Sequence, residues 1–543
     1  MLSPDMIAAN EQLESQVRRR RTFAIISHPD AGKTTLTEKL LLYAGAVDQA
    51  GSVRARKNQR RATSDWMALE QQRGISITST VLQFEYQDHL FNLLDTPGHQ
   101  DFGEDTYRTL MAVDSAVMVL DSAKGIEPQT VKLFKICRQR NLPLLTFINK
   151  LDQPGRDPLQ LLDEIESVLN LKAAPLNWPV GTGDKFKGVY DLVSQQVLLF
   201  ERVAGGRYRA PVAVTDLYDP RLATLIGDAA YAELREDIEL VVGASAPFDP
   251  AAFARGEQTP VFFGSALNNF GVEPFVEAII RLAPAPQPHM SAQGLITPES
   301  EGFSGFVFKI QANMDPQHRD SIAFVRVCSG RFEKDVVVHH SRSSQKIRLS
   351  RPHRIFAGER ETIDEAYPGD VIGLSNPGAF MIGDTLSAGV RLEYPPIPAF
   401  QPECFALLRN TAADKYKQFR KGLEQLRQEG VVQVLHDRAG GRREPILAAV
   451  GQLQFDVVLS RLVTEYRAEA EVQPLPYVTA GWIEADEPAL SALYWPQGSL
   501  MTVDPLGQIV GLFRSEWELS YFVERNTTAH VTDAAGIALR PAR

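Results

Sequence analysis

The sequence predicts a multidomain protein in which an α/β domain is followed by a β-barrel and an α+β domain. Up to about residue 282, continuous apolar runs alternate with helical stretches. From residue 302 to about residue 393, short strands alternate with glycine and proline turns, and no long helical pattern is present. Strand–helix alternation returns at residues 401–480. Each of these textures is typical of one of the three architectures.

The apolar runs of the first part are continuous, which is typical of parallel strands buried on both faces. Helices are expected between them at residues 34–43 and 128–139. Asp157-Pro158 begins another helix, with an N-cap followed by a first-turn proline. Residues 1–21 indicate a short polar helix, and residues 170–258 indicate an insertion rich in short strands and loops. The expected strands are residues 23–27, 90–94, 116–120, 144–148 and 260–263.

Proline clusters mark the expected domain boundaries. Prolines between residues 284 and 288 form a stiff, extended linker, and a second cluster at residues 395–398 closes the barrel. We therefore expect domains at residues 1–290, 291–398 and 399–543. The barrel strands include residues 305–310, 322–327 and 336–339. The last domain is expected to contain a helix ending near Gly430, strands at residues 431–435 and 446–450, a helix at 455–466 and a weaker strand at 509–513.

The cysteine pattern fits a protein of the reducing cytoplasm. Its three cysteines are too far apart for metal or redox spacing. The N-terminus has no apolar stretch of signal-peptide length before Phe23, and no window reaches the length of a membrane span. A net charge of −10 argues against a nucleic-acid coat protein, although basic patches at residues 54–61 and 415–421 allow local RNA contact. The four arginines at residues 18–21 are expected to form a solvated helix end.

A phosphate-binding loop follows the first apolar run. Residues 27–34 read Ser-His-Pro-Asp-Ala-Gly-Lys-Thr and depart from the usual pattern only at Ser27, where glycine is common. Gly32 lets the backbone approach a phosphate, and Lys33 can reach the outer phosphates. The Thr34 hydroxyl can ligate magnesium. The alternative is a chance match in a strand-to-helix turn, but the flanking strand and helix favour the loop.

Asp-Thr-Pro-Gly-His at residues 95–99 follows the next apolar run. Asp95 ends a strand, where its carboxylate would hold magnesium through water. Gly98 permits a backbone N–H to approach a terminal phosphate. His99 then lies near any attacking water, the alternative being a histidine that only starts a helix.

Asn-Lys-Leu-Asp at residues 149–152 follows the run at residues 144–148. Asp152 can accept hydrogen bonds from the guanine N1–H and exocyclic amine, a donor pair that adenine lacks. Asn149 is expected to join this loop to the phosphate loop, and backbone N–H groups of residues 264–267 complete the base pocket. Three motifs in this order indicate an α/β P-loop GTPase domain.

A switch segment is expected between the first two motifs. Residues 72–78 read Gln-Arg-Gly-Ile-Ser-Ile-Thr. A hydroxyl here would ligate magnesium only while a γ-phosphate is present, as in the order–disorder switch of GTPases. Ser76 is the better candidate and Thr78 the second, and the alternative is an ordinary strand lead-in.

The assembled motifs resemble those of translational GTPases. Asp-Ala-Gly-Lys-Thr-Thr at residues 30–35, Arg-Gly-Ile at 73–75, the motif at 95–99 and residues 121–130 carry this resemblance. Finer features are similar to the bacterial class II peptide chain release factors. They are residues 26–30, 312–320, 365–370 and 450–458.

This resemblance implies a GTPase that binds the terminating ribosome and promotes departure and recycling of class I release factors. His99 would position the attacking water, Asp30 would help to stabilise charge near the phosphates together with Lys33, and the cofactors would be GTP or GDP with Mg²⁺. We expect ribosome-stimulated hydrolysis of GTP to GDP and phosphate by a cytoplasmic monomer that contacts rRNA and ribosomal proteins but no membrane. The expected metal ligands are Thr34, Ser76 and Asp95. The expected nucleotide-binding residues are Ser27, His28, Pro29, Asp30, Ala31, Gly32, Lys33, Thr34, Thr35, Asp95, Thr96, Pro97, Gly98, His99, Asn149, Lys150, Leu151, Asp152, Ser265, Ala266 and Leu267.

Three alternatives stay open at this point. A translocase or ribosome-protection factor would need further domains, whereas about 145 residues follow the expected barrel. A metabolic GTPase such as the regulatory subunit of sulfate activation would share the first two domains but not residues 450–458. A nucleotide-binding scaffold without hydrolysis is disfavoured by Lys33, Asp95 and His99.

Overall fold

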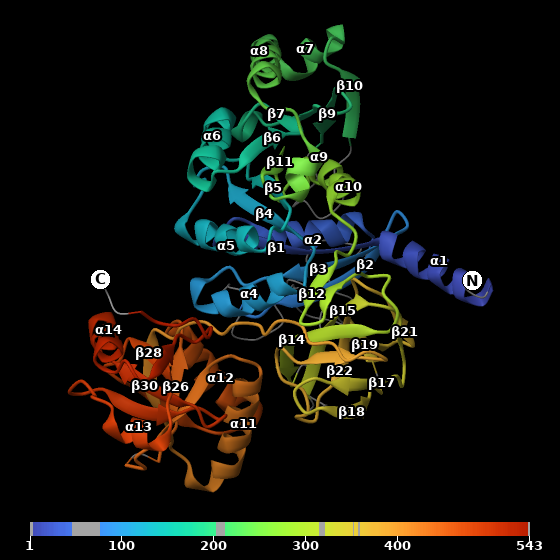
Figure 1. Cartoon of the computed structure of the whole chain (residues 1–543). Helices are drawn as coiled ribbons and strands as arrows, with labels where there is room; N and C mark the ends of the chain where they lie inside the picture. Colours follow the sequence, from blue (N-terminus) through green and yellow to red (C-terminus); the bar gives the residue numbers. More distant parts are fainter. Residues whose placement is uncertain are drawn as a thin grey trace.

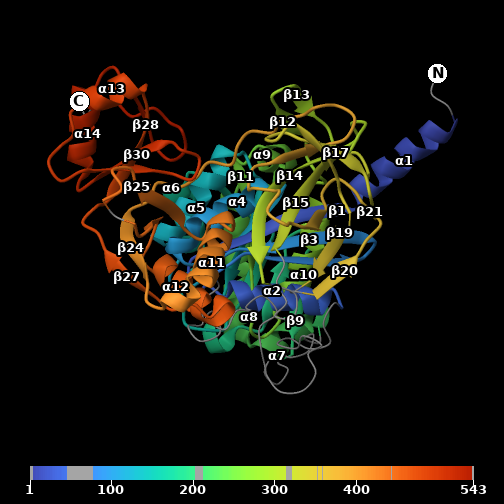
Figure 2. The ribbon, with the colours of Figure 1, turned by 90° about the horizontal axis from the view of Figure 1, so that it is seen from below.

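Figure 1 shows the computed structural model, which describes residues 4–45, 77–201, 212–313, 321–350, 352–356, 359–441 and 443–540. Three sheet-containing units follow one another along the chain, coloured from blue to green, yellow, and orange to red. The polar helix expected near the start is α1 (Pro4–Arg18), which projects away from the rest of the molecule (Figure 2). None of the helices in the described part of the chain has the length and apolar character needed to span a bilayer.

The first unit is built on a seven-stranded sheet of order β2-β3-β1-β4-β5-β11-β6. All five expected strands are confirmed, and their pairings are parallel. The edge strand β2 (Thr80–Tyr86) is antiparallel to its neighbour, because only Gln87 and Asp88, both with positive φ, connect the two in a tight hairpin. The other strands are β1 (Arg20–Ser27), β3 (His89–Asp95), β4 (Ser115–Asp121), β5 (Leu144–Asn149), β6 (Lys172–Pro175) and β11 (Gln258–Phe263).

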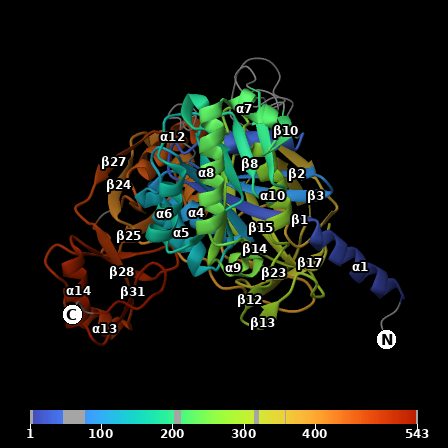
Figure 3. The same ribbon diagram turned by 90° about the horizontal axis from the view of Figure 1, so that it is seen from above.

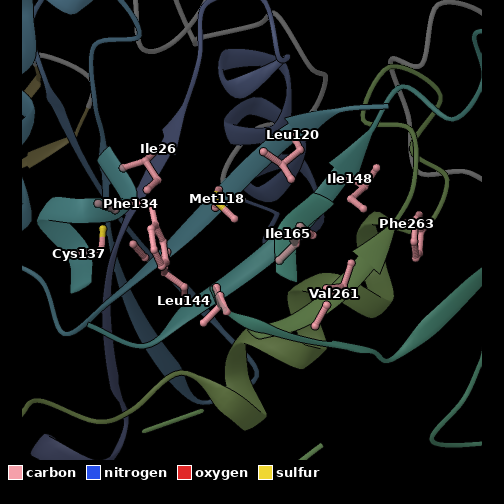
Figure 4. Packing of buried hydrophobic residues seen from close by; sticks show 14 of the residues in the cluster. Ile26, Met118, Leu120, Phe134, Cys137, Leu144, Ile148, Ile165, Val261 and Phe263 are labelled. Carbon is pink, nitrogen blue, oxygen red and sulfur yellow. The ribbon is translucent and has the colours of Figure 1, made fainter. Parts of the chain in front are cut away.

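Helices cover both faces of this sheet because each strand sends alternate apolar residues to opposite sides. On one face Ile26, Met118 and Ile148 pack with Phe134 and Ile165 (Figure 4). On the other face the apolar core is formed with α2 (Lys33–Tyr43) and α10 (Val272–Leu282). The helices of the first face are α4 (Gly103–Met111), α5 (Pro128–Gln139) and α6 (Pro158–Leu169).

The segment at residues 170–258 contains more helix than the sequence analysis expected. Its antiparallel sheet, of order β10-β9-β8-β7, is accompanied by the 17-residue helix α8 (Asp228–Ala244). Only Leu234, Ile238 and Val241 are buried on α8, so its apolar stripe is narrow and its helical pattern is weak. This part of the chain lies at the top of the molecule in Figure 1 and nearest the viewer in Figure 3, which is seen from above. Its remaining elements are β7 (Asn177–Val180), β8 (Gly188–Asp191), β9 (Gln196–Phe200), β10 (Val212–Asp216), α7 (Pro220–Ile226) and α9 (Pro250–Ala254).

The second unit is a curled antiparallel sheet of eight strands, ordered β18-β17-β23-β14-β15-β22-β19-β20. The three strands expected here are confirmed. Its core contains Val307, Val325, Ile372 and Leu386. The strands of this sheet are β14 (Ser304–Ala312), β15 (Ser321–Ser329), β17 (Val337–His340), β18 (Gln345–Arg348), β19 (Pro352–Phe356), β20 (Glu359–Thr362), β22 (Val371–Ser375) and β23 (Thr385–Ser387). Two small pairs flank it, β12 (His289–Ser291) with β13 (Gly294–Ile296) and β16 (Phe332–Glu333) with β21 (Glu365–Ala366).

The third unit is an α+β arrangement, as expected, with an eight-stranded sheet of order β27-β24-β26-β25-β29-β30-β28-β31. The two expected helices are confirmed as α11 (Tyr416–Gln428) and α12 (Leu453–Tyr466). The strand expected at residues 509–513 is β30 (Ile509–Phe513), whereas the short elements around it were not predicted. The other elements are β24 (Cys404–Asn410), β25 (Gln433–Asp437), β26 (Ile446–Ala449), β27 (Ala470–Pro474), β28 (Thr479–Glu484), α13 (Glu487–Ala492), β29 (Leu500–Val503), α14 (Glu516–Arg525) and β31 (His530–Thr532).

Buried ion pairs join the first unit to the barrel, and they correct one expectation. The run of arginines at residues 18–21 is not simply a solvated helix end, because Arg20 is buried in β1 and pairs with Asp370 at 2.9 Å. A second pair joins Arg326 of β15 to Asp114 at 2.6 Å. Burial raises the pKa of Asp114, while Arg326 acts in the opposite direction. Since a buried charge is costly without a partner, each pair holds the two units together.

Candidate functional site

The loop between β1 and α2 has the backbone of a phosphate cradle. Gly32 caps α2 with φ 92°, and Asp30 also has a positive φ of 67°. A Cβ at Gly32 would overlap the Asn149 side-chain amide, so only glycine fits. The helix N-terminus that follows presents backbone N–H groups suited to an anion.

Lys33 and Asp95 face each other at the floor of this loop. Lys33 Nζ lies 2.5 Å from Asp95 Oδ1, and both side chains are buried. The second carboxylate oxygen of Asp95 is buried without a hydrogen-bond partner in the described chain. That oxygen and the hydroxyl of Thr34, in the first turn of α2, are hard ligands of the kind Mg²⁺ takes, so the donor set fits this ion.

Asn149 connects the phosphate loop to the base loop. Its Nδ2 donates to the Ala31 carbonyl at 2.8 Å, and its Oδ1 accepts from the Ala266 N–H at 2.9 Å. The side chain is buried at the end of β5. One amide therefore fixes the relative position of two loops that are about 235 residues apart in sequence.

The two carboxylate oxygens of Asp152 differ in their hydrogen bonding. Its Oδ2 accepts from Asn268 Nδ2 at 3.0 Å. Its Oδ1 is buried without a hydrogen-bond partner in the described residues. Such an oxygen is costly to bury alone, so it is suited to a ligand donor. The Asn268 brace was not predicted, because it follows the Ser-Ala-Leu motif and has no motif of its own.

Lys150 is held by a carboxylate at the end of β4. Its backbone φ is 68°, and its Nζ donates to Asp121 Oδ2 at 2.8 Å. Burial pushes the pKa of Asp121 up, but hydrogen bonds from Lys150 and the Ala123 N–H outweigh it, so this pKa lies below its usual value. Asp121 was also missed as a supporting residue, although its place at a strand end pointed to this edge.

Residues 264–267 form a tight turn beside the base loop. Ser265 and Phe270 exchange backbone hydrogen bonds of 2.9 and 3.0 Å. A Cβ at Gly264 would crowd the Phe270 carbonyl and the Phe147 ring. The Leu267 side chain is exposed, so this turn offers backbone groups to a ligand.

His99 lies at the mouth of the site. Its side chain is 30% exposed, and its Nδ1 accepts from the Asp101 N–H at 3.2 Å. Gly98 passes close to Pro29 of the phosphate loop, where a Cβ would be 3.7 Å from the proline Cα.

Ser76, expected as a metal ligand, lies outside the described residues. Thr78, the second candidate, lies between the described edge of that segment and β2.

His28 is the one histidine of the phosphate loop. It is fully buried, and its Nε2 lies 3.4 Å from Glu127 Oε2. Burial lowers the pKa of His28, and the nearby carboxylate of Glu127 only partly offsets this. The ring is therefore neutral at pH 7.

The structure brings the expected loops to one edge of the sheet. They follow the carboxyl ends of β1, β3, β5 and β11, which is where ligands bind in open α/β sheets.

Residues 18–285 match the elongation factor Tu GTP binding domain, and residues 302–389 match elongation factor G domain 2. Residues 394–523 match the class II release factor RF3 C-terminal domain. Fold, loops and matches together define a translational GTPase that acts in termination.

Similar whole proteins narrow this further. The chain is 59% identical over 519 residues to peptide chain release factor 3 of Gloeobacter violaceus, covering 95% of this chain and 98% of the relative. It is 58% identical over 506 residues to the same factor of Cyanothece sp., covering 93% of each. The chain belongs to the peptide chain release factor 3 family. In fold it is similar to a crystal structure of a Thermus thermophilus protein, ttk003000868, with a TM-score of 0.68 and 21% identity over 90% of this chain and 73% of that one.

Proposed function

We propose that this GTPase binds the terminating ribosome in the cytoplasm and uses GTP to promote dissociation and recycling of class I release factors. The observation that supports this best is the match of residues 394–523 to a release-factor domain, joined in one chain to a match of residues 18–285 to the elongation factor Tu GTP binding domain. The relatives named above are peptide chain release factors, and this chain matches each of them over nearly its whole length. We propose that the protein acts as a monomer with domains at residues 1–290, 291–398 and 399–543.

The nucleotide would be held by the loops that follow β1, β3, β5 and β11. The Asp152 oxygen without a partner would accept from guanine, and the turn at residues 264–267 would offer backbone N–H groups to the base. Lys33 would turn from Asp95 to the outer phosphates, and Thr34 and Asp95 would hold Mg²⁺ together with Ser76. The ion supplies charge neutralisation of the phosphates.

His99 would orient the attacking water, and the ribosome would complete the site. The buried arginines near the GTPase domain are already engaged, Arg20 with Asp370, Arg108 with Glu104, and Arg326 with Asp114. None of these three is therefore available to neutralise the γ-phosphate. We expect slow hydrolysis alone and activation by ribosomes of about 10⁵-fold, or roughly 7 kcal/mol.

The alternatives differ in what they predict. A sulfate-activation GTPase would stay in the supernatant when ribosomes are sedimented. A release factor would co-sediment with the ribosomes when GTP is present. A scaffold would bind GTP without single-turnover hydrolysis.

The deciding experiment measures release and recycling of a class I factor on termination complexes, comparing the intact chain with His99→Ala. We expect His99→Ala to bind nucleotide normally and to lose hydrolysis. Equal GTP hydrolysis by the wild-type chain with and without ribosomes would contradict the proposal.

A further inference from the structure

Asp101 lies between His99 and the third unit of the molecule. It belongs to the short 3₁₀ turn Gln100–Phe102 that separates His99 from α4, and it is 8% exposed. Its backbone N–H donates to His99 Nδ1, and its carboxylate Oδ1 lies 3.4 Å from the same nitrogen. Since Nδ1 accepts in this contact, the neutral ring carries its hydrogen on Nε2.

The other side of the Asp101 carboxylate contacts the start of α12. Its Oδ2 accepts from the Leu453 N–H at 2.9 Å, and Leu453 is the first residue of α12. The positive end of the helix favours a carboxylate here. Gly451 lies directly against this carboxylate, because a Cβ at that position would overlap it.

The segment that carries Gly451 is itself held firmly. Gln454 Oε1 accepts from the N–H groups of Val450 and Gly451 at 2.8 and 3.1 Å. Its Nε2 donates to the Val431 carbonyl at 2.7 Å. This turn is part of residues 450–458, the segment whose role the nucleotide site leaves unexplained.

Apolar packing supports the same contact. Phe102 and Ile77 of the GTPase domain form a small buried cluster with Val457 of α12. The Phe102 ring centroid is 6.1 Å from that of His99. The surroundings of His99 therefore include α12 as well as the GTPase domain.

We propose that Asp101 is a positioning residue through which the third unit sets the orientation of His99 for GTP hydrolysis. Docking of the turn at residues 450–454 fixes the Asp101 carboxylate and with it the 3₁₀ turn, whose Asp101 backbone N–H donates to His99 Nδ1 and so orients the imidazole. A ribosomal contact that shifts α12 would then change hydrolysis without touching the nucleotide. This inference rests on the proposed role of His99.

Gly451→Ala tests it from the third unit. The added methyl group must displace the Asp101 carboxylate, while the nucleotide loops are untouched. We expect ribosome-stimulated kcat to fall by about tenfold or more, since small misplacements of a catalytic group are costly, with GTP affinity unchanged. Gly243→Ala is the matched control, because a Cβ there meets nothing within 4 Å.

A double-mutant cycle separates positioning from general loss of stability. In an Asp101→Ala background the carboxylate is gone, so Gly451→Ala should lower kcat no further. Equal effects of Gly451→Ala in both backgrounds would overturn the proposal, as would a wild-type kcat in both single variants.

A readout that needs no ribosome distinguishes failure of this inference from failure of the proposed function. Modification of His99 by diethyl pyrocarbonate, followed by peptide mapping, should be faster in Gly451→Ala and unchanged in Gly243→Ala. An unchanged rate at His99 in Gly451→Ala would overturn the positioning role. Absence of ribosome stimulation in the wild-type chain would instead overturn the proposed function.

Discussion

Arg20 and Asp370 form an ion pair at 2.9 Å in which both side chains are only 5% exposed. Arg20 belongs to β1 of the GTPase sheet, and Asp370 precedes β22 of the barrel. The Asp370 carboxylate also accepts from Gln83 and from the Tyr367 N–H, at 3.2 and 2.9 Å. The Arg20 guanidinium lies 4.8 Å from the centre of the Tyr367 ring. The first strand of the nucleotide site is thus anchored in the barrel.

Arg20→Ala should destabilise the protein by about 3–5 kcal/mol, because it leaves the Asp370 charge buried and unpaired. Thermal unfolding followed by circular dichroism measures this. Arg18→Ala is the matched control, since the Arg18 side chain is 79% exposed and its ion pair with Glu14 contributes little. Equal unfolding temperatures for the two variants would contradict the assignment.

Lys33→Ala should weaken GTP binding by about 1.5–3 kcal/mol, because it removes the charged hydrogen-bond donor that we propose binds the outer phosphates. It also leaves Asp95 without its buried partner. Titration with a fluorescent GTP analogue measures the affinity. Lys132→Ala, at a lysine on the outer side of α5, should bind as the wild type does. Wild-type affinity in Lys33→Ala would exclude Lys33 from the phosphate site.

Asp152→Asn should lower GTP affinity by about 2–3 kcal/mol, because an amide donor would replace the acceptor that we propose faces guanine. Asn268→Ala should cost less, about 1 kcal/mol, since it removes only the 3.0 Å brace on Asp152 Oδ2. Isothermal titration with GTP measures the loss of affinity in each variant, and titration with ATP measures the selectivity for guanine. Unchanged selectivity in Asp152→Asn would show that another group reads the base.

Acid should destabilise the fold through His289. Burial lowers the pKa of His289 to about 3, with Arg326 and Arg140 acting in the same direction. The unfolded chain binds this proton below about pH 6.5, so stability is lost as the pH falls from about 6.5 toward 3, by about 2 kcal/mol at about pH 5. Urea unfolding at several pH values measures this. His289→Gln should flatten the dependence by that amount, whereas His530→Gln, at a side chain 60% exposed, should not.

The sequence predicts those parts of the fold whose signal is local. Strands such as β4 and β5 are continuous apolar runs, and motif residues stand at their carboxyl ends. The same stretch of sequence therefore predicted both the strand and the functional loop that follows it. Helix α8 was missed because it buries only a thin stripe, and the elements after β28 other than β30 were missed because their apolar runs are short.

Contacts between distant residues escaped prediction. In the sequence, Arg20 belongs to a run of arginines that is typical of a solvated helix end. Its ion-pair partner, Asp370, is 350 residues away along the chain. In the site, the nucleotide loops come from spacing, whereas Asn268, Asp121 and Asp101 act by bracing other residues. No local pattern distinguishes such a brace from an ordinary polar side chain.

Asn149 carries a further consequence for how guanine nucleotides are taken up. The two ends of its amide serve Ala31 and Ala266, so neither loop can shift without straining the other. We therefore expect binding of the phosphates at the first loop and of the base at the second to be coupled through this one amide.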